Sequence, residues 1–278
     1  MDSYGHCEVL VREADRDRFL AALFAPAGLR PHLFALYAFN AEVARVRDAA
    51  KTPIAGEIRL QWWRDALSGE GHGEVRANPV ADALLTTVAA HGLPVAPLLD
   101  LIEARSFDLY DDPMPSLEAL YGYVRKTSSG LIDSAARILA GPDPFIAALA
   151  GPAGIGWGLA RILQAVPLHA ARGQVYVPAD FLREHGVDPA DILARRTGPG
   201  FSAALADLRA RARLELAEAA RATKMLPVAA APAFLPVALA GPLLDRLERQ
   251  QAADPFALVD LPAWRRQWIL WRASRAHQ

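Results

Sequence analysis

Apolar residues recur along this chain at spacings of three to four positions, which is the period of one face of an α-helix. Leu205, Leu208, Ala212, Leu216 and Ala219 show this spacing within one segment. Strict alternation of apolar and polar residues, the pattern of a half-buried β-strand, is almost absent. The pattern predicts an all-α protein.

Helices are expected wherever this period continues between breaks that contain glycine and proline. The expected helices cover residues 15–24, 30–50, 54–68, 78–91, 94–109, 116–140, 143–168, 201–223, 232–251 and 261–275. The breaks, such as residues 141–142 and 198–200, are too short to link separate domains. We therefore expect a single domain over residues 1–278.

The 278 residues are 53% hydrophobic and 22% charged, which supplies enough apolar material for one large core. A balance of 30 basic and 31 acidic residues gives a formal charge of −1, so we expect no nucleic-acid partner. The one cysteine, Cys7, excludes a disulfide within the chain. The N-terminal sequence MDSYGHCEVLVREADRDRF is acidic and polar, unlike a secretory signal, which favours the cytoplasm.

The longest uncharged run, residues 225–244, has the length of a membrane span. It contains Pro227, Pro232, Pro236 and Pro242. Each proline inside a helix costs about 3 kcal/mol, so one unbroken span is strongly disfavoured. We expect broken helices packed on the rest of the protein.

The C-terminal sequence, LPAWRRQWILWRASRAHQ, predicts an amphipathic helix over residues 261–275. Trp264, Trp268 and Trp271 stand at positions i, i+4 and i+7, and arginines lie between them. This composition is typical of a helix that lies in a membrane interface. Two interpretations stay open: a peripheral contact with the inner membrane, or tryptophans packed on the domain beside solvated arginines.

Several segments together resemble the squalene/phytoene synthase family, the helical head-to-head prenyltransferases. They are FLAALFAPAGLRPHLFALYAF, LFALYAFNAEVARVRDAA, the tryptophan pair after Gln61, an aspartate segment at residues 105–110 and the exit loop RGQVYVP. The likeness runs from about Asp15 to about Leu247 and keeps the family's order. It implies an isoprenoid-synthase type of helical bundle.

Members with synthase activity use magnesium to bridge prenyl diphosphates to aspartates one helical turn apart. The family's first aspartate motif falls here on residues 44–48, where only Asp48 is acidic, and the second falls on residues 165–169, where none is. Asp108 matches an aspartate of the family's middle segment. The resemblance therefore leaves Asp48 and Asp108 as residual catalytic candidates.

Arginines surround the positions of the two motifs: Arg45, Arg47, Arg161 and Arg172. At close range they repel a divalent cation, so we expect no metal, with Mg²⁺ retained only if the chain is a transferase. Arg161 lies between apolar residues on a core helix, and we expect it to pair with Glu42 or Asp48. His169 is expected to be a neutral histidine near the end of its helix.

The family's reaction cavity maps onto residues of several expected helices. These candidate pocket residues are Tyr37, Phe39, Asn40, Glu42, Arg45, Asp48, Tyr123, Arg161, Gln164, His169, Arg172 and Tyr176. The aromatic members could line a space for an isoprenoid tail, or they could be ordinary core residues.

One branch of the family, formed by assembly factors of respiratory complex I, has lost the same carboxylates. The segments FALYAFNAEVARVRDAAKTPIAGEIRLQWWRDAL and ILQAVPLHAARGQVYVPADFLREHGV are similar to that branch. This likeness implies a non-catalytic protein acting in the biogenesis of a membrane complex. Two other functions stay open: an active prenyl diphosphate transferase that uses Asp48 and Asp108, and an isoprenoid- or lipid-binding protein whose arginines hold a phosphate.

Overall fold

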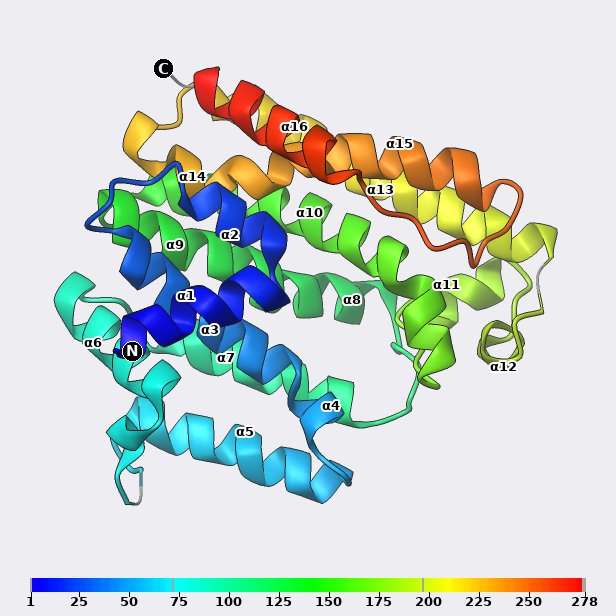
Figure 1. Cartoon of the computed structure of the whole chain (residues 1–278). Coiled ribbons are helices and arrows are strands. Elements are labelled where there is room, and N and C mark those ends of the chain that lie inside the picture. Colours follow the sequence, from blue (N-terminus) through cyan, green and yellow to red (C-terminus); the bar gives the residue numbers. More distant parts are fainter. Residues whose placement is uncertain (1, 72, 197, 277–278) are drawn as a thin grey trace.

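The computed structural model describes residues 2–71, 73–196 and 198–276, and every regular element in these ranges is helical (Figure 1). The elements are α1 (Ser3–Ala14), α2 (Arg16–Ala22), α3 (Arg30–Ala44), α4 (Val46–Ala49), α5 (Pro53–Ser68), η1 (Val75–Ala77), α6 (Pro79–His91), α7 (Ala96–Ser106), η2 (Phe107–Leu109), α8 (Leu117–Val124), η3 (Arg125–Ser129), α9 (Gly130–Ala140), α10 (Pro144–Ala171), α11 (Ala179–Glu184), α12 (Pro189–Leu193), α13 (Pro199–Thr223), η4 (Val228–Ala230), α14 (Ala231–Phe234), η5 (Leu235–Leu239), α15 (Ala240–Gln251) and α16 (Ala263–Arg275). The all-α prediction is confirmed for the described residues.

The long helix α10 lies at the centre of the bundle, with α13, α15 and α16 on one side and α1, α3 and α7 on the other (Figure 1). Its first turn is capped by Asp143, whose carboxylate accepts hydrogen bonds from two backbone amides. Pro144 follows at the first helical position, where its missing N–H has no cost. The buried residues fall into two apolar clusters, and α10 contributes to both.

Two glycines let α10 approach the short π-helical segment η3 closely. A Cβ atom on Gly154 would lie 2.4 Å from the Cα of Ser129, and one on Gly158 would lie 2.3 Å from a Val124 methyl. Pro167, inside α10, leaves the Leu163 carbonyl without its helical donor. The buried Gln251 side chain supplies a donor to that carbonyl at 3.4 Å.

Several predicted helices are divided in the structure: the one expected over residues 94–109 into α7 and η2, and the one expected over residues 232–251 into α14, η5 and α15. The helix expected over residues 30–50 breaks at Arg45, which separates α3 from α4. The helix expected over residues 116–140 contains η3, a π-helical turn. No helix was predicted over α1, because its apolar stripe is short. In the structure only Cys7 and Val11 of this helix are buried.

The proline-rich run at residues 225–244 forms η4, α14, η5 and the start of α15, so the prediction of broken helices is confirmed. Two helical stretches, Pro144–Ala171 and Val228–Gln251, are long and apolar enough to cross a membrane. Their apolar windows are 67% and 61% buried within the bundle, as in the core helices of many globular proteins. Length and composition therefore do not make either of them a membrane span.

Candidate functional site

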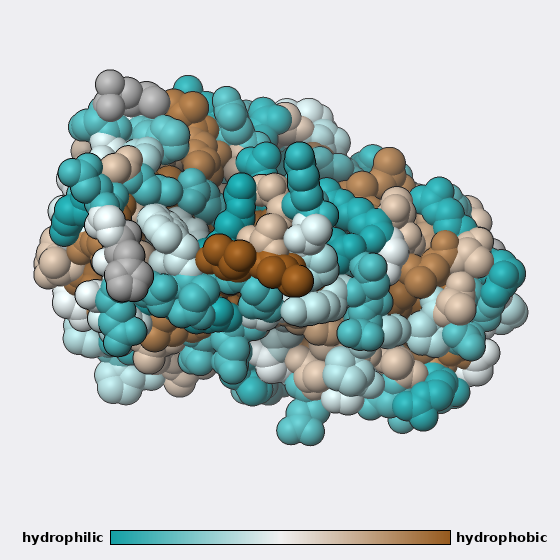
Figure 2. Space-filling view, turned by 90° about the horizontal axis from the view of Figure 1, so that it is seen from below, coloured by the Kyte–Doolittle hydropathy of each residue, from teal (hydrophilic) through white to brown (hydrophobic). Residues whose placement is uncertain are grey.

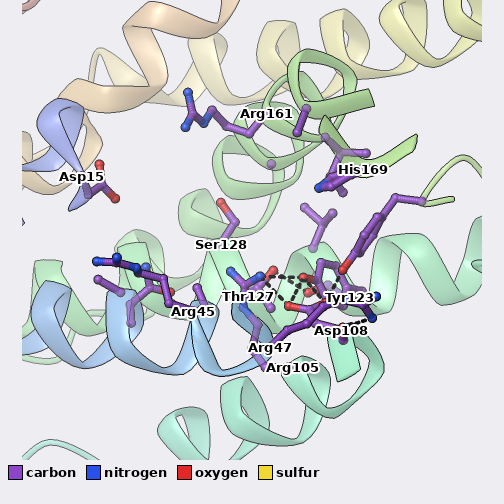
Figure 3. A pocket seen from close by; sticks show the side chains of 18 of the residues that line it. Asp15, Arg45, Arg47, Arg105, Asp108, Tyr123, Thr127, Ser128, Arg161 and His169 are labelled. Atoms are coloured by element: carbon purple, nitrogen blue, oxygen red, sulfur yellow. Dashed lines mark hydrogen bonds and ion pairs between the residues drawn. The ribbon is translucent and has the colours of Figure 1, made fainter. Parts of the chain in front are cut away.

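A cavity of about 310 Å³ lies where α3 and α4 face α10, with α2, η2 and η3 closing its sides (Figure 3). Six arginines and three aspartates line it. The charged and polar lining residues are Asp15, Arg18, Asn40, Arg45, Arg47, Asp48, Arg105, Asp108, Tyr123, Thr127, Ser128, Arg161, His169, Arg172, Gln174 and Tyr176. The cavity is therefore rich in positive charge.

Asp108 is the centre of a buried network at one end of this cavity (Figure 3). Its carboxylate accepts hydrogen bonds from the Tyr123 hydroxyl at 2.8 Å and from the Tyr176 hydroxyl. Arg105 Nη1 donates to the other carboxylate oxygen at 3.0 Å and to the Tyr123 oxygen at 2.6 Å. Gln174 Nε2 donates to the Asp108 backbone carbonyl at 3.0 Å. Both carboxylate oxygens are thus committed to protein donors.

The protonation states of this network are fixed by burial and by its own charges. Burial raises the pKa of Tyr123 and Tyr176 well above the usual tyrosine value, and the Asp108 carboxylate raises both further. Burial alone would lower the pKa of Arg105, but Tyr123 and Asp108 hold it above its usual value. Near neutral pH the tyrosines are neutral donors and Arg105 is a cation.

The other two aspartates of the cavity are paired with arginines as well. Asp48 lies 3.2 Å from Arg172 Nη1, and Asp15 pairs with Arg18 at 2.5 Å. Asp15 also caps α2, because its carboxylate accepts a hydrogen bond from the Arg18 amide. Although burial opposes ionisation of Asp15, the Arg18 guanidinium and amide lower its pKa.

Arg47 joins three segments of the chain at the cavity rim. Its guanidinium donates to the carbonyls of Asp108, Tyr110 and Arg172 and to the Asp111 carboxylate at 2.6 Å. Arg47 falls within the family's first metal motif. Here its side chain links α4 to the loop after η2 and to the end of α10 by hydrogen bonds.

The prediction that Arg161 pairs with Glu42 or Asp48 is wrong. Arg161 Nη1 donates to Gln164 Oε1 at 2.6 Å and lies 3.8 Å from Asp17, on α2. Its guanidinium also lies 5.5 Å from the centre of the Trp157 ring. The sequence could not predict Asp17 as the partner, because α2 is distant from α10 along the chain.

Four buried polar atoms of the cavity lack a hydrogen-bond partner, and one of them, Arg105 Nε, belongs to the Asp108 network itself. The buried atoms that line the cavity and make no hydrogen bond are Asn40 Oδ1, Arg105 Nε, Ser128 Oγ and His169 Nδ1. Arg45 makes no ion pair within the described part of the chain, and its side chain is exposed at the cavity edge. Groups of this kind are usually satisfied by water or by a ligand.

His169 lies against the Tyr176 ring, with ring centres 4.3 Å apart. Burial lowers the pKa of His169 to about 4, and Arg172 and Arg105 add to this effect against the opposing charge of Asp108. The expectation of a neutral histidine at the end of α10 agrees with this placement.

The remaining candidate pocket residues lie outside this cavity. Tyr37 and Phe39 are 2% and 0% exposed and belong to the apolar core, where Phe39 packs edge-on against Trp63. Glu42 lines a second cavity of about 540 Å³ between α3 and α5. Gln164 lines a third, of about 490 Å³, and donates to the Val259 carbonyl at 2.8 Å.

The carboxylates of the cavity do not fit a magnesium cage. Asp48 and Asp108 come from α4 and η2, and each is held by an arginine. Within residues 2–71, 73–196 and 198–276 no three His, Cys, Asp or Glu side chains converge on a metal-sized site. Magnesium needs several oxygen ligands in an octahedral arrangement, and this cavity offers it guanidinium groups.

Sequence reasoning missed several parts of the site. Arg105 and Gln174 hold Asp108, but both lie in segments without a recognisable metal motif. Thr127 and Ser128 enter the lining through the π-helical turn, which local periodicity does not predict. These four residues could have been found only from the resemblance to the family, because they lie within its aspartate, tyrosine and exit segments.

Comparisons with known proteins bear on this cavity. Complex I assembly factor 6 of Rattus norvegicus is 31% identical over 248 residues, which are 89% of this chain and 74% of the relative. The 15-cis-phytoene synthase of Synechococcus elongatus is 25% identical, over 95% of this chain and 90% of the enzyme. The crystal structure of squalene synthase HpnC from Alicyclobacillus acidocaldarius superimposes with a TM-score of 0.75 at 27% identity, covering 90% of this chain and 94% of that one.

These similarities confirm the predicted fold and the predicted likeness to the assembly factors. The model of the squalene/phytoene synthase family matches residues 11–272. This match spans every wall of the cavity and, apart from Cys7, the buried residues of both core clusters. The chain therefore belongs to the squalene/phytoene synthase family.

Proposed function

We propose that this protein acts, without catalysis, in the assembly of respiratory complex I. The observation that carries the proposal is its 31% identity to complex I assembly factor 6 over most of the chain, against 25% to a phytoene synthase. The cavity supports the same conclusion. Its acidic residues are bound by arginines and tyrosines, so they do not offer a magnesium diphosphate the ligands it needs.

This function places the protein at the inner membrane, where complex I is built, as a peripheral rather than a spanning protein. The proposal needs no Mg²⁺ and no metal ligand. It assigns Asp108 a structural role and leaves Asp48 with a surface ion pair whose two side chains are 45% and 52% exposed.

Deletion of the gene in its own organism tests the proposal. We expect less assembled complex I and a matching loss of NADH:quinone oxidoreductase activity in membranes, with succinate:quinone activity unchanged as the control. Re-expression of the wild type and of Asp48→Asn should both restore complex I, because no metal chemistry is required. An unchanged level and activity of complex I in the deletion strain would contradict the proposal.

A second function is favoured by the unpartnered cationic end of the cavity. We propose that Arg45, with Asn40 and Ser128 beside it, binds an anionic group such as the phosphate of an isoprenoid or lipid, directly and without metal. Guanidinium groups bind phosphate through paired, charge-assisted hydrogen bonds. The cavity's excess of arginines over aspartates and the unpaired Ser128 hydroxyl, which can donate a hydrogen bond, support this ligand class.

Calorimetric titration with inorganic pyrophosphate, in the presence of EDTA, tests this second function. Arg45→Gln should weaken binding by roughly tenfold or more, because a charge-assisted hydrogen bond contributes about 1.5–3 kcal/mol. Arg76→Gln removes an exposed arginine outside the cavity and should bind as the wild type does. Equal binding by the wild type and Arg45→Gln would contradict the assignment.

A further inference from the structure

The inner face of α16 is fixed to the body of the protein. Leu270 is 1% exposed and packs in the second core cluster. Arg266 Nε lies 2.7 Å from an Asp17 oxygen, and the same guanidinium pairs with Asp260. These contacts determine which side of α16 faces solvent.

The outer face of α16 carries three tryptophans. Trp264, Trp268 and Trp271 are 69%, 52% and 44% exposed, and the last two stack with ring centres 5.1 Å apart. At 100° per residue they and Arg275 fall within an arc of about 60°, on the side opposite Arg266. A solvent-facing helix normally carries polar residues on this side. α16 lies at the outer edge of the bundle (Figure 1), and the exposed fractions of its three tryptophans show that the stripe faces solvent.

The charges around the stripe have one sign. Residues 263–276 contain four arginines and no aspartate or glutamate. Arg266 is used within the protein, whereas Arg265, Arg272 and Arg275 make no ion pair within the described ranges. The Arg275 guanidinium lies 5.4 Å from the centre of the Trp271 ring. The stripe therefore has an aromatic centre and a cationic border.

We propose that this face, formed by Trp264, Trp268, Trp271 and the arginines beside them, docks the protein onto an anionic lipid bilayer. Indole rings bury an apolar body at the boundary of the headgroups and keep an N–H donor for the polar region. Arginines beside them meet lipid phosphates, and anionic leaflets attract such cations. The inference deepens the proposed peripheral location, on which it rests, and its test with vesicles can fail or succeed independently of the complex I assay.

The charge along the edge of the tryptophan stripe indicates which kind of partner binds this face. A stable protein interface buries about 1,200–2,000 Å² and mixes both signs of charge at its rim. On α16 the charged residues beside the stripe are all arginines, with Arg265 and Arg272 along one edge and Arg275 within it, and this charge complements a surface of phosphates.

Sedimentation of the full chain with vesicles tests the proposal. Vesicles are made of phosphatidylcholine alone or with about one third phosphatidylglycerol, to supply an anionic surface. We expect binding to the anionic vesicles only. Replacing all three tryptophans by alanine should weaken it at least about tenfold through lost apolar burial. Arg265→Gln, Arg272→Gln and Arg275→Gln together should weaken it on the order of a hundredfold, because each cation contributes about fivefold.

A matched control uses exposed apolar residues elsewhere. Ile54 and Ile58, 74% and 66% exposed, lie on α5, far from α16 in Figure 1. Figure 2 shows that face of the molecule, where apolar patches are small and separated by hydrophilic side chains. Ile54→Ala with Ile58→Ala should bind anionic vesicles as the wild type does. Circular dichroism checks that every variant folds.

Tryptophan fluorescence gives a second measurement, which reports whether the indole rings themselves meet the lipid. Brominated lipids should quench the wild type and leave the triple tryptophan variant almost unchanged, because Trp63 and Trp157 are only 4% and 3% exposed and the partly buried Trp62 lies on α5, far from α16. Equal binding of wild type and triple variant would overturn the proposal. A wild type that ignores anionic vesicles but self-associates through the three tryptophans would also overturn it.

Discussion

The two ends of the cavity differ in how their polar atoms are satisfied. Around Asp108, three side chains donate to the carboxylate, and those of Gln174 and Arg47 donate to the backbone carbonyl. Of the atoms in this network, Arg105 Nε is buried without a partner, and elsewhere in the cavity Asn40, Ser128 and His169 each have such an atom. Arg45, at the cavity edge, makes no ion pair within the residues that the structure describes.

This difference distinguishes residues of the cavity that stabilise the fold from residues that are available to a ligand. A satisfied buried network stabilises the fold and resists change, because each atom removed leaves another unpaired. Unpaired atoms in an open cavity stabilise nothing in the isolated protein and are available to a ligand or to water. We infer that the acidic end is structural and that the cationic end is the part open to binding.

The largest expected effect is at the acidic end. Asp108→Asn leaves the mostly buried Arg105 cation without its counter-charge and should lower the free energy of unfolding by about 3–5 kcal/mol. Asp48→Asn, in the same cavity, breaks only an exposed ion pair and should cost about 0–1 kcal/mol. Urea denaturation of both variants measures the comparison. Equal losses would show that Asp108 is no more structural than Asp48.

A smaller effect concerns pH. The pKa of His169 is about 4 in the folded protein, against 6.5 for an ordinary histidine, because burial disfavours its charged form. The unfolded chain therefore binds the extra proton between these values. Stability from this group is complete above pH 6.5 and is lost as the pH falls to 4, by up to about 3 kcal/mol.

His169→Gln should remove this part of the pH dependence. Burial lowers the pKa of His32 as well, but that residue is present in both proteins, so the difference between their unfolding curves isolates His169. Parallel curves between pH 4 and pH 7 would mean that His169 is not held neutral by its surroundings.

The smallest effect is expected at the cationic end. Ser128 Oγ is buried without a partner, so Ser128→Ala should change the free energy of unfolding by less than about 1 kcal/mol, or raise it slightly. Thr127, its neighbour, donates to the Tyr123 carbonyl at 2.8 Å, so Thr127→Val is the matched change that removes a real bond. A larger loss for Ser128→Ala than for Thr127→Val would reverse the assignment of the two ends.

Local patterns predicted the fold well because helices follow from residues three and four positions apart. The apolar period located α5, α6, α10 and α13 to within a few residues. The break at Arg45 was missed, because it depends on how α4 meets η2 and not on the residues of the helix itself.

The site was only partly predictable. Asn40, Arg45, Asp48, Tyr123, Arg161, His169, Arg172 and Tyr176 do line the cavity. The pairings within it were not predictable, because Asp17 meets Arg161 and Arg105 meets Asp108 through contacts between separate helices. For Tyr37 and Phe39 the sequence left two alternatives open, because an aromatic residue on an apolar helix has the same local pattern in a core and in a pocket wall; the structure places both in the core.

The central claim is that this cavity keeps the family's shape without its metal-dependent chemistry. Incubation of the purified protein with farnesyl and geranylgeranyl diphosphates and magnesium, followed by an assay for released diphosphate, tests it most directly. We expect no release above a protein-free control, because every aspartate of the cavity is paired with an arginine. Magnesium-dependent release that Asp48→Asn abolishes would contradict the claim.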